Sequence, residues 1–158
     1  MTELLGSELK KAITGWFFPF RYNLERWAYA LQRISGIVVT AYFLAHIVET
    51  GNVVGGLSVW SSPSTGFARD VWTATFRFLD NPFFDIGLVV VGSLLAYHTI
   101  NGIRLTFTEF GLLQGKPSRP DFPYKPKSFT NSQRALFWLS IIFAAATAVY
   151  AMNVFFGI

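Results

Sequence analysis

Three long apolar runs constrain this chain more than any other feature of its sequence. They extend from about Ala28 to Val48, from about Phe83 to Phe107, and from Ala135 to Ile158. Each run supplies about 20 residues, the length that crosses about 30 Å of hydrocarbon at a rise of about 1.5 Å per residue. Because a backbone inside lipid must satisfy its own hydrogen bonds, each run is predicted to be a helix.

The composition favours lipid as the surroundings of these helices. Only 14% of the 158 residues are charged, against about a quarter in a typical soluble domain. Buried helices of a soluble protein are the alternative, but three such runs leave too little polar surface to cover them. We therefore expect an all-α membrane protein. An N-terminal cytoplasmic or interfacial segment (1–27) precedes a three-helix transmembrane domain (28–158), with helices at about 28–50, 83–108 and 134–157.

The basic residues are distributed unequally between the two sides of these helices. Eleven of the thirteen Lys and Arg residues precede or open the first helix, or lie between the cores of the second and third. Only Arg69 and Arg77 fall in the connection between the first two helices. The positive-inside rule then predicts a cytoplasmic N-terminus and an external C-terminus. The same asymmetry accounts for the net charge of +4, so nucleic acid is not expected as a partner.

The two connections between helices differ in composition. Residues 49–82 are rich in Gly, Ser and Thr and are expected to form a loop, with Trp60 and Trp72 in the outer interfacial layer. Residues 111–134 are rich in Pro and Lys. They are expected to form an extended basic surface loop that touches lipid headgroups or a soluble partner.

The chain has two histidines, His46 and His98, and both fall inside predicted membrane helices. An ionisable residue within the membrane is by default a candidate functional site. The alternative is a neutral histidine that is hydrogen-bonded to a neighbouring helix. Imidazole is a good iron ligand and a standard axial ligand of haem. A ligating histidine is expected to hold its other ring nitrogen on a nearby carbonyl or hydroxyl.

Helical rise places the two histidines at different depths. His46 lies 13 residues beyond Arg33, or about 20 Å, and His98 lies 6 residues before Arg104, or about 9 Å from the same edge. One iron needs both ring nitrogens about 2 Å away, so two haem levels are expected, with each second ligand supplied by another chain. Arg33 and Arg104 either pair with haem propionates or extend to the headgroups. Gly102, one turn beyond His98, lets a porphyrin or another helix approach closely.

Two sequence motifs carry a resemblance to a known family. The first helix contains Gln32-Arg33-Ile34-Ser35-Gly36 and later Tyr42-Phe43-Leu44-Ala45-His46, and the second contains His98-Thr99-Ile100-Asn101-Gly102-Ile103-Arg104 followed by Glu109-Phe110-Gly111. Over about residues 27–111 the chain resembles the larger membrane-anchor subunit of succinate dehydrogenase. That family has an arginine-x-Ser-Gly motif opening the first helix and a His-x-x-x-Gly-Ile-Arg motif in the second.

The resemblance implies roles for particular residues. His98 matches the family's haem ligand, and His46 is similar to the additional ligand of two-haem members, in which the first two helices serve different haems. Arg33 matches an arginine near the quinone site and a haem propionate. Tyr29 stands where the family often has a small polar residue that contacts quinone, and it is expected to contact quinone together with Arg33 and Ser35. Gln32 replaces a histidine that is common in the family.

The resemblance also implies a function. The chain is expected to form half of a haem-binding helical bundle with a second membrane-anchor subunit in a prokaryotic cytoplasmic membrane. A flavoprotein subunit oxidises succinate, an iron–sulfur subunit passes the electrons to quinone, and two haem b groups are shared between the anchor subunits. This chain itself has no flavin-binding glycine motif and no cysteine for an iron–sulfur cluster.

Two alternatives remain open from the sequence. One is a b-type cytochrome anchor of another respiratory oxidoreductase, such as fumarate reductase, a hydrogenase or formate dehydrogenase. Hydrogenase and formate dehydrogenase anchors typically place more histidines in more helices of one chain, so two histidines in three helices favour the succinate dehydrogenase anchor. The other is a haem-free structural membrane anchor or assembly protein, which a reduced-minus-oxidised absorption spectrum distinguishes from both cytochromes.

Overall fold

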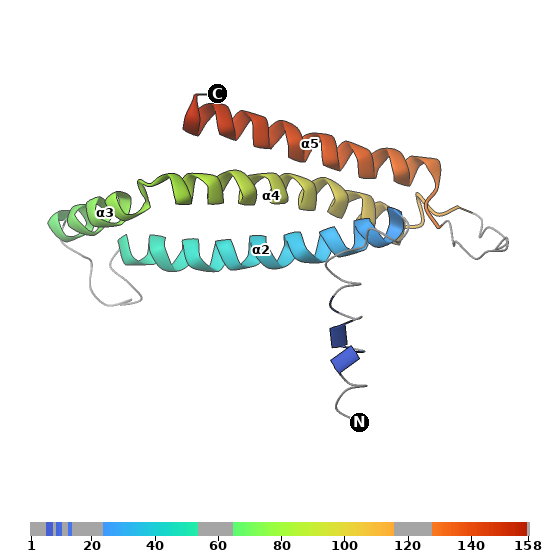
Figure 1. The fold of residues 1–158 in the computed structure, drawn as a ribbon, viewed down its shortest axis with the longest axis horizontal. Coiled ribbons are helices and arrows are strands. Elements are labelled where there is room, and N and C mark those ends of the chain that lie inside the picture. Colours follow the sequence, from blue (N-terminus) through green and yellow to red (C-terminus); the bar gives the residue numbers. More distant parts are fainter. Residues whose placement is uncertain are drawn as a thin grey trace. The chain divides into compact units, whose positions relative to one another are not determined.

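The structure is a computed structural model that describes residues 24–53, 65–115 and 128–157, together with a few residues near the N-terminus. These N-terminal residues are Gly6, Ser7, Leu9, Lys10 and Ile13. The three longer ranges form helices and short connections and contain no strand. The helices, labelled in Figure 1, are α2 (Leu24–Val53), α3 (Thr65–Leu79), α4 (Pro82–Glu109) and α5 (Asn131–Phe156).

Three of these helices are long and apolar enough to cross a membrane. The candidate spans are Leu24–Gly51, Pro82–Glu109 and Asn131–Phe156. This confirms the predicted all-α membrane fold with three spanning helices. The helices begin slightly earlier than the apolar runs indicated, since α2 starts at Leu24 and α5 at Asn131. The first turns of both helices contain polar and charged residues, which the apolar runs do not include.

Local sequence determines both ends of α4. Before its first turn, the side-chain Oδ1 of Asn81 accepts the backbone N–H of Phe83 at 2.8 Å, which satisfies one of the donors that a helix start leaves without a partner. After its last turn, Gly111 adopts a φ of 77°, a conformation that costs glycine little. The N–H of Leu112 then returns to the carbonyl of Phe107 at 3.0 Å and closes the helix end.

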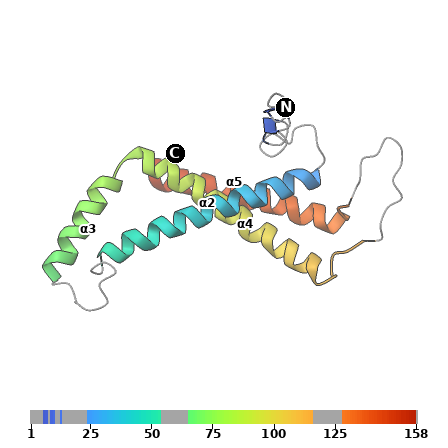
Figure 2. The same cartoon turned by 90° about the horizontal axis from the view of Figure 1, so that it is seen from below.

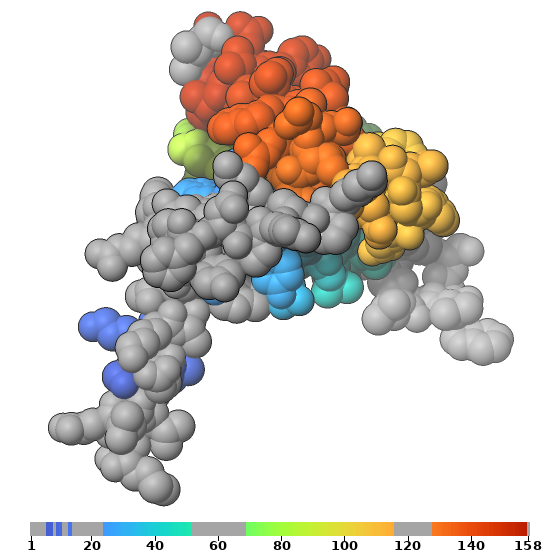
Figure 3. Space-filling model, turned by 90° about the vertical axis from the view of Figure 1, so that its right-hand side faces the viewer, coloured from blue at the N-terminus to red at the C-terminus, as the bar shows by residue number. Residues whose placement is uncertain are grey.

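A reciprocal cap starts α5 and ties it to the chain that follows α4. The N–H of Gln133 donates to Thr130 Oγ1, and the N–H of Thr130 donates to Gln133 Oε1, both at 3.3 Å, which is the capping-box arrangement. Gln133 Nε2 also donates to the carbonyl of Leu113 at 3.1 Å. The end of α4 and the start of α5 accordingly lie side by side in Figure 3.

Helix α3 corrects the expectation that the whole connection between the first two spans is a loop. Its half-buried residues Val71, Thr75 and Leu79 recur every four positions, which is the spacing of one helix face. The overall content of Gly, Ser and Thr concealed this periodicity. Trp72 is exposed, whereas Trp60 lies outside the described residues. Figure 2 shows α3 meeting α4 at a corner.

The chain divides into two compact units. The first unit comprises Met1–Ser35 and Tyr97–Ile142, and the second comprises Gly36–Ala96 and Phe143–Ile158. Within the first unit α2 and α5 start where α4 ends, so α4 runs antiparallel to both. Buried residues in the described part of the first unit are Ala28, Ala30, Ser35, Tyr97, Asn101, Arg104, Gln133, Phe137 and Ser140, and those in the second are Val39 and Val89.

Burial in these helices is inverted relative to a soluble protein. Five of the eleven buried residues are polar or charged, whereas most large apolar side chains of the described helices are exposed. Apolar side chains suit lipid on the outside, and polar groups inside the membrane must find partners within the protein. The polar residues of the first unit are therefore where a functional site is to be sought.

Candidate functional site

His98 of α4 is held by a hydroxyl from α2. Its ring Nδ1 lies 3.0 Å from Ser35 Oγ, and Ser35 Oγ lies 3.1 Å from the carbonyl oxygen of Gln32, to which it donates. With its hydrogen committed to that carbonyl, the hydroxyl oxygen accepts from Nδ1–H, and we assign this tautomer to the ring. Nε2 then carries the lone pair that a metal requires. The contact expected for a ligating histidine is thus present at His98.

A chain of hydrogen bonds runs from His98 to Arg104, and we call its side chains, Gln32, Asn101 and Arg104, the polar relay. Gln32 Nε2 donates to the carbonyl of His98 at 3.4 Å. Asn101 Nδ2 donates to Gln32 Oε1 at 2.7 Å, and Arg104 Nε donates to Asn101 Oδ1 at 2.8 Å. Asn101 and Arg104 are 0% and 3% exposed. Arg104 is therefore turned into the protein, and the alternative that it extends to the headgroups does not describe its position here.

A cavity of about 610 Å³ lies in the first unit beside the polar relay. This volume falls in the range of small-molecule sites. Two guanidinium groups at the cavity lie over aromatic rings: Arg33 Cζ is 4.4 Å from the ring centroid of Tyr29, and Arg104 Cζ is 4.5 Å from that of Phe129. The described residues that line it are Glu25, Ala28, Tyr29, Gln32, Arg33, Arg104, Leu105, Thr108, Gln114, Gly115, Ser128, Phe129 and Gln133.

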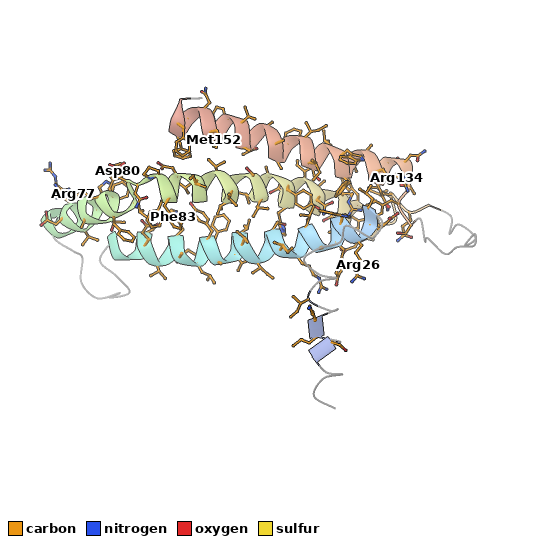
Figure 4. The ribbon with its side chains drawn as sticks, in the orientation of Figure 1. Arg26, Arg77, Asp80, Phe83, Arg134 and Met152 are labelled. Carbon is orange, nitrogen blue, oxygen red and sulfur yellow. The ribbon has the colours of Figure 1, made fainter. Side chains whose placement is uncertain are left out.

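The start of α2 is fastened to the segment that leads into α5. Glu25 Oε1 accepts the backbone N–H of Phe129 at 3.2 Å and lies 3.9 Å from Arg134 Nη2. Figure 4 labels Arg134 and Arg26, which belong to the first turns of α5 and α2. The contact with Phe129 brings its ring to the cavity, where it meets Arg104. The cavity is consequently built from all three spanning helices and from the residues just before α5.

His46 belongs to the second unit and has different surroundings. The residue is exposed, and its ring is stacked on that of Tyr42, with centroids 5.8 Å apart and planes 10° apart. Within the described ranges, no group of three or more His, Cys, Asp or Glu residues is arranged to hold a bare metal ion. A metal at either histidine would therefore need other ligands, such as those of a macrocycle and a second chain.

The structure brings together most, but not all, of the residues that the sequence singled out. Tyr29, Arg33 and Arg104 line one cavity. Ser35, expected to contact quinone, is not among the lining residues; it is fully buried and contacts His98. His46 lies in the other unit.

Several residues of the site were not assigned from the sequence. Gln32 and Asn101 are polar residues at membrane depth, a signal that they need partners, but their mutual pairing was not evident. Glu25 precedes Tyr29 and Arg33 by four and eight residues, the spacing of one helix face. Phe129 carried no signal, because only the folding of the connection places it at the cavity.

Three apolar spanning helices with buried polar side chains and a hydrogen-bonded histidine define a multi-pass membrane protein with an intramembrane polar site. Residues 10–149 match the model of a family described as succinate dehydrogenase/fumarate reductase transmembrane subunit. This chain belongs to that family. The resemblance stated from its two helix motifs is thereby confirmed.

The chain is also similar to a protein of Halobacterium salinarum that is described as a succinate dehydrogenase hydrophobic membrane anchor subunit. The two are 29% identical over 91 residues, which cover 58% of this chain and 62% of the relative. The similarity thus spans less than two thirds of the relative's length. No solved structure matches the chain.

Proposed function

We propose that this chain is the membrane-anchor cytochrome b subunit of a succinate dehydrogenase, which holds haem b and forms part of the quinone site. The observation that carries the proposal is the position of His98. Its Nδ1 is hydrogen-bonded to Ser35, which leaves the ring's other nitrogen, Nε2, to bind iron. The polar relay connects the backbone of His98 to a cavity of suitable size. Family membership supports the anchor role.

The residues around His98 fit a haem. A haem iron takes a neutral imidazole nitrogen as its axial ligand, and the Ser35 contact stabilises the tautomer that offers Nε2. Either arginine can form charge-assisted hydrogen bonds to a propionate. When bound, haem b accepts and releases one electron at a time. His98, Arg33 and Arg104 are the residues of this unit that would hold it, and Ser35 would orient the ligand.

His46 is proposed to hold a second haem. Along α2 it lies eleven residues beyond Ser35, the residue that contacts His98, which corresponds to a rise of about 16 Å. A single iron does not reach both imidazoles across such a rise, because each must come to about 2 Å from the metal. The exposed His46 would then share its haem with a partner subunit, which would supply the second ligand.

The cavity is proposed to be this chain's part of the quinone site. A quinone has a flat apolar ring and two carbonyl oxygens. Arg33 can donate to one of these oxygens, while the rings of Tyr29 and Phe129 provide apolar surface. The contact between Arg33 and the Tyr29 ring restrains both side chains before a ligand arrives. Tyr29 replaces the small polar residue of many relatives with a larger surface that retains a hydroxyl.

The proposed complex needs three further subunits. A flavoprotein would oxidise succinate, an iron–sulfur protein would deliver the electrons to the cavity, and a second anchor subunit would complete the haem ligands. The described chain is a membrane anchor by family, and the three partners follow from the proposed function. We place the complex in a prokaryotic cytoplasmic membrane.

The test of the quinone site is Arg33→Leu in the purified complex. We expect quinone reduction by succinate to fall by about tenfold or more, because a hydrogen bond from a charged donor contributes about 1.5–3 kcal/mol. Succinate oxidation with an artificial soluble acceptor should persist. The matched control is Arg77→Leu on α3, which should retain wild-type quinone reduction. Wild-type quinone reduction in Arg33→Leu would contradict the assignment, and equal loss of both activities would point to a role of Arg33 in assembly instead.

The proposed orientation places the N-terminus in the cytoplasm, on the basis of the eleven-to-two split of basic residues. The chain has no cysteine, so single cysteines can be introduced without background from this subunit. A cysteine at Ser62 should react with a membrane-impermeant maleimide from outside, and one at Ser118 should not. Both positions lie outside the described residues, and the reverse labelling would overturn the orientation.

A further inference from the structure

Among the described residues that line the cavity, one is acidic: Glu25, which the proposed function has not used. Glu25 lies in the first turn of α2, one and two turns before Tyr29 and Arg33, and all three line the cavity. Its side chain is only 16% exposed. The carboxyl group therefore borders the cavity and keeps a small exposed surface in the first turn of the helix.

The known contacts of Glu25 engage one of its two carboxylate oxygens. Both the N–H of Phe129 and the guanidinium of Arg134 approach Oε1. Among the contacts described for this part of the chain, Oε2 is the oxygen that remains to carry a proton. Among the described residues, the charged or titratable side chains that pair with the carboxyl group or line the same cavity are Arg134 of α5, Arg104 of α4, and Tyr29 and Arg33 of α2.

Reduction of a quinone requires protons as well as electrons. Two electrons and two protons convert its two carbonyl oxygens into two hydroxyl groups, with the electrons supplied one at a time by an iron–sulfur centre of a partner subunit. Arginines keep their protons, amides do not titrate, and a phenol gives up its proton only at alkaline pH. Within the cavity lining, the carboxyl group of Glu25 is thus the group suited to exchanging protons with water during turnover.

We propose that Glu25 passes protons from the water at the start of α2 to the quinone bound in the cavity, an inference that rests on the proposed quinone function. The carboxyl group gives a proton to a quinone oxygen as that oxygen gains an electron, and it regains one from water. Repeating the step delivers the second proton to the other oxygen. In quinol oxidation the same carboxylate accepts the protons in the reverse order.

A purely structural role for Glu25 can be separated from proton transfer. In its structural role Glu25 accepts the N–H of Phe129, and glutamine supplies that acceptor without a transferable acidic proton. Glutamine loses the charge of the 3.9 Å pair with the partly exposed Arg134, which contributes little to stability. E25Q therefore preserves the hydrogen bond to Phe129 and removes proton transfer, whereas E25A removes both. E25D keeps the acid but shortens the side chain by one methylene group.

The experiment measures quinone reduction by succinate in the whole purified complex, with a short-chain soluble quinone, from acid to alkaline pH. For E25Q we expect kcat to fall by about tenfold or more, which is at the lower end of the usual contribution of a positioned acid. The KM for quinone should stay within about twofold, because binding is not removed. The pH dependence of kcat should differ between E25Q and the wild type, because a group that exchanges protons has been removed. E25D should be several-fold faster than E25Q.

Three further measurements complete the test. Asp80→Asn, which neutralises an exposed acid at the α3–α4 corner, should keep the wild-type profile. Succinate oxidation with an artificial acceptor should be equal in all variants. Wild-type kcat in E25Q across the pH range would overturn the proposal that Glu25 transfers protons. A defect confined to E25A, or equal rates in E25D and E25Q, would overturn it as well. If Arg33→Leu leaves quinone reduction intact, the cavity is not the quinone site, and the proposed function fails whatever E25Q shows.

Discussion

The two histidines of this chain lie in different units and differ in their hydrogen bonding and exposure. In the first unit, His98 is anchored by a hydroxyl from another helix and is joined through its backbone carbonyl to three polar side chains. In the second unit, His46 is exposed and is stacked on a tyrosine of its own helix. The chain thus orients one imidazole by itself and presents the other on its surface.

The same contrast appears in the packing of the two units. Nine of the eleven buried residues belong to the described part of the first unit, and the five polar ones among them all lie there. In the second unit, Val39 and Val89 are the buried residues of the described ranges. This difference indicates that the first unit is largely organised within this chain, whereas the second unit offers its helix surfaces to lipid or to a partner subunit.

Of the substitutions that test this difference between the units, His98→Ala should have the largest effect on haem content and electron transfer. Removing the oriented ligand should eliminate the haem proposed at His98 (the inner haem, nearer the cytoplasm), so the complex should retain about half of its haem, and quinone-linked electron transfer should slow. The measurement is a reduced-minus-oxidised spectrum with extracted haem counted per complex. A full haem content in this variant would contradict the proposed ligand.

His46→Ala should remove the haem proposed at His46 (the outer haem) and leave the inner one spectroscopically intact, because the first unit holds His98 without using any residue near His46. Haem content should again fall by about half, but quinone reduction should change less than in His98→Ala. If the wild-type complex contains one haem and His46→Ala leaves it unchanged, His46 is a packing residue and the second haem does not exist.

Ser35→Ala should produce an intermediate effect that is confined to the inner haem. Loss of the hydroxyl removes the partner of His98 Nδ1, and such partners typically contribute about 10–100-fold in metal affinity. The readouts are haem retention on dilution and the reduction potential of the inner haem. Ser140→Ala is the matched control, since Ser140 is also fully buried but bonds to the carbonyl of Phe137 on its own helix. Equal haem retention in the two variants would mean that the Ser35 contact does not orient the ligand.

Tyr97→Phe should have the smallest effect and should change stability alone. The buried Tyr97 hydroxyl donates to the carbonyl of Ala28 at 3.2 Å, and the loss of one such bond costs about 1 kcal/mol. We expect a slightly lower thermal unfolding temperature of the complex and an unchanged haem spectrum. Tyr150 is 72% exposed and lies on the part of α5 that belongs to the second unit. The complex that carries Tyr150→Phe should therefore unfold at the wild-type temperature. If Tyr150→Phe lowered the unfolding temperature more than Tyr97→Phe, the second unit would be the one more dependent on contacts within this chain, contrary to the comparison made above.

The sequence alone determined the fold class, the three spanning helices and the residues at which chemistry was to be sought. The physical reason is that the bilayer imposes a length and an apolar composition on each span and makes polar residues within it costly. The motifs around Arg33 and His98 were therefore recognisable without knowledge of any contact. Helix α3 was missed, because an amphipathic helix of 15 residues is too short and too polar to be recognised by the criteria that detect spans.

Only the tertiary structure decided which polar residues meet. Gln32 and Asn101 are 69 residues apart in the chain, yet their side-chain amides lie 2.7 Å from one another. Ser35 contacts His98, 63 residues away in the chain, a pairing that the sequence did not indicate. Glu25 and Phe129 meet across 104 residues. Helix periodicity constrains the residues that share a face, but the choice of partner across helices depends on packing, which no local pattern of residues specifies.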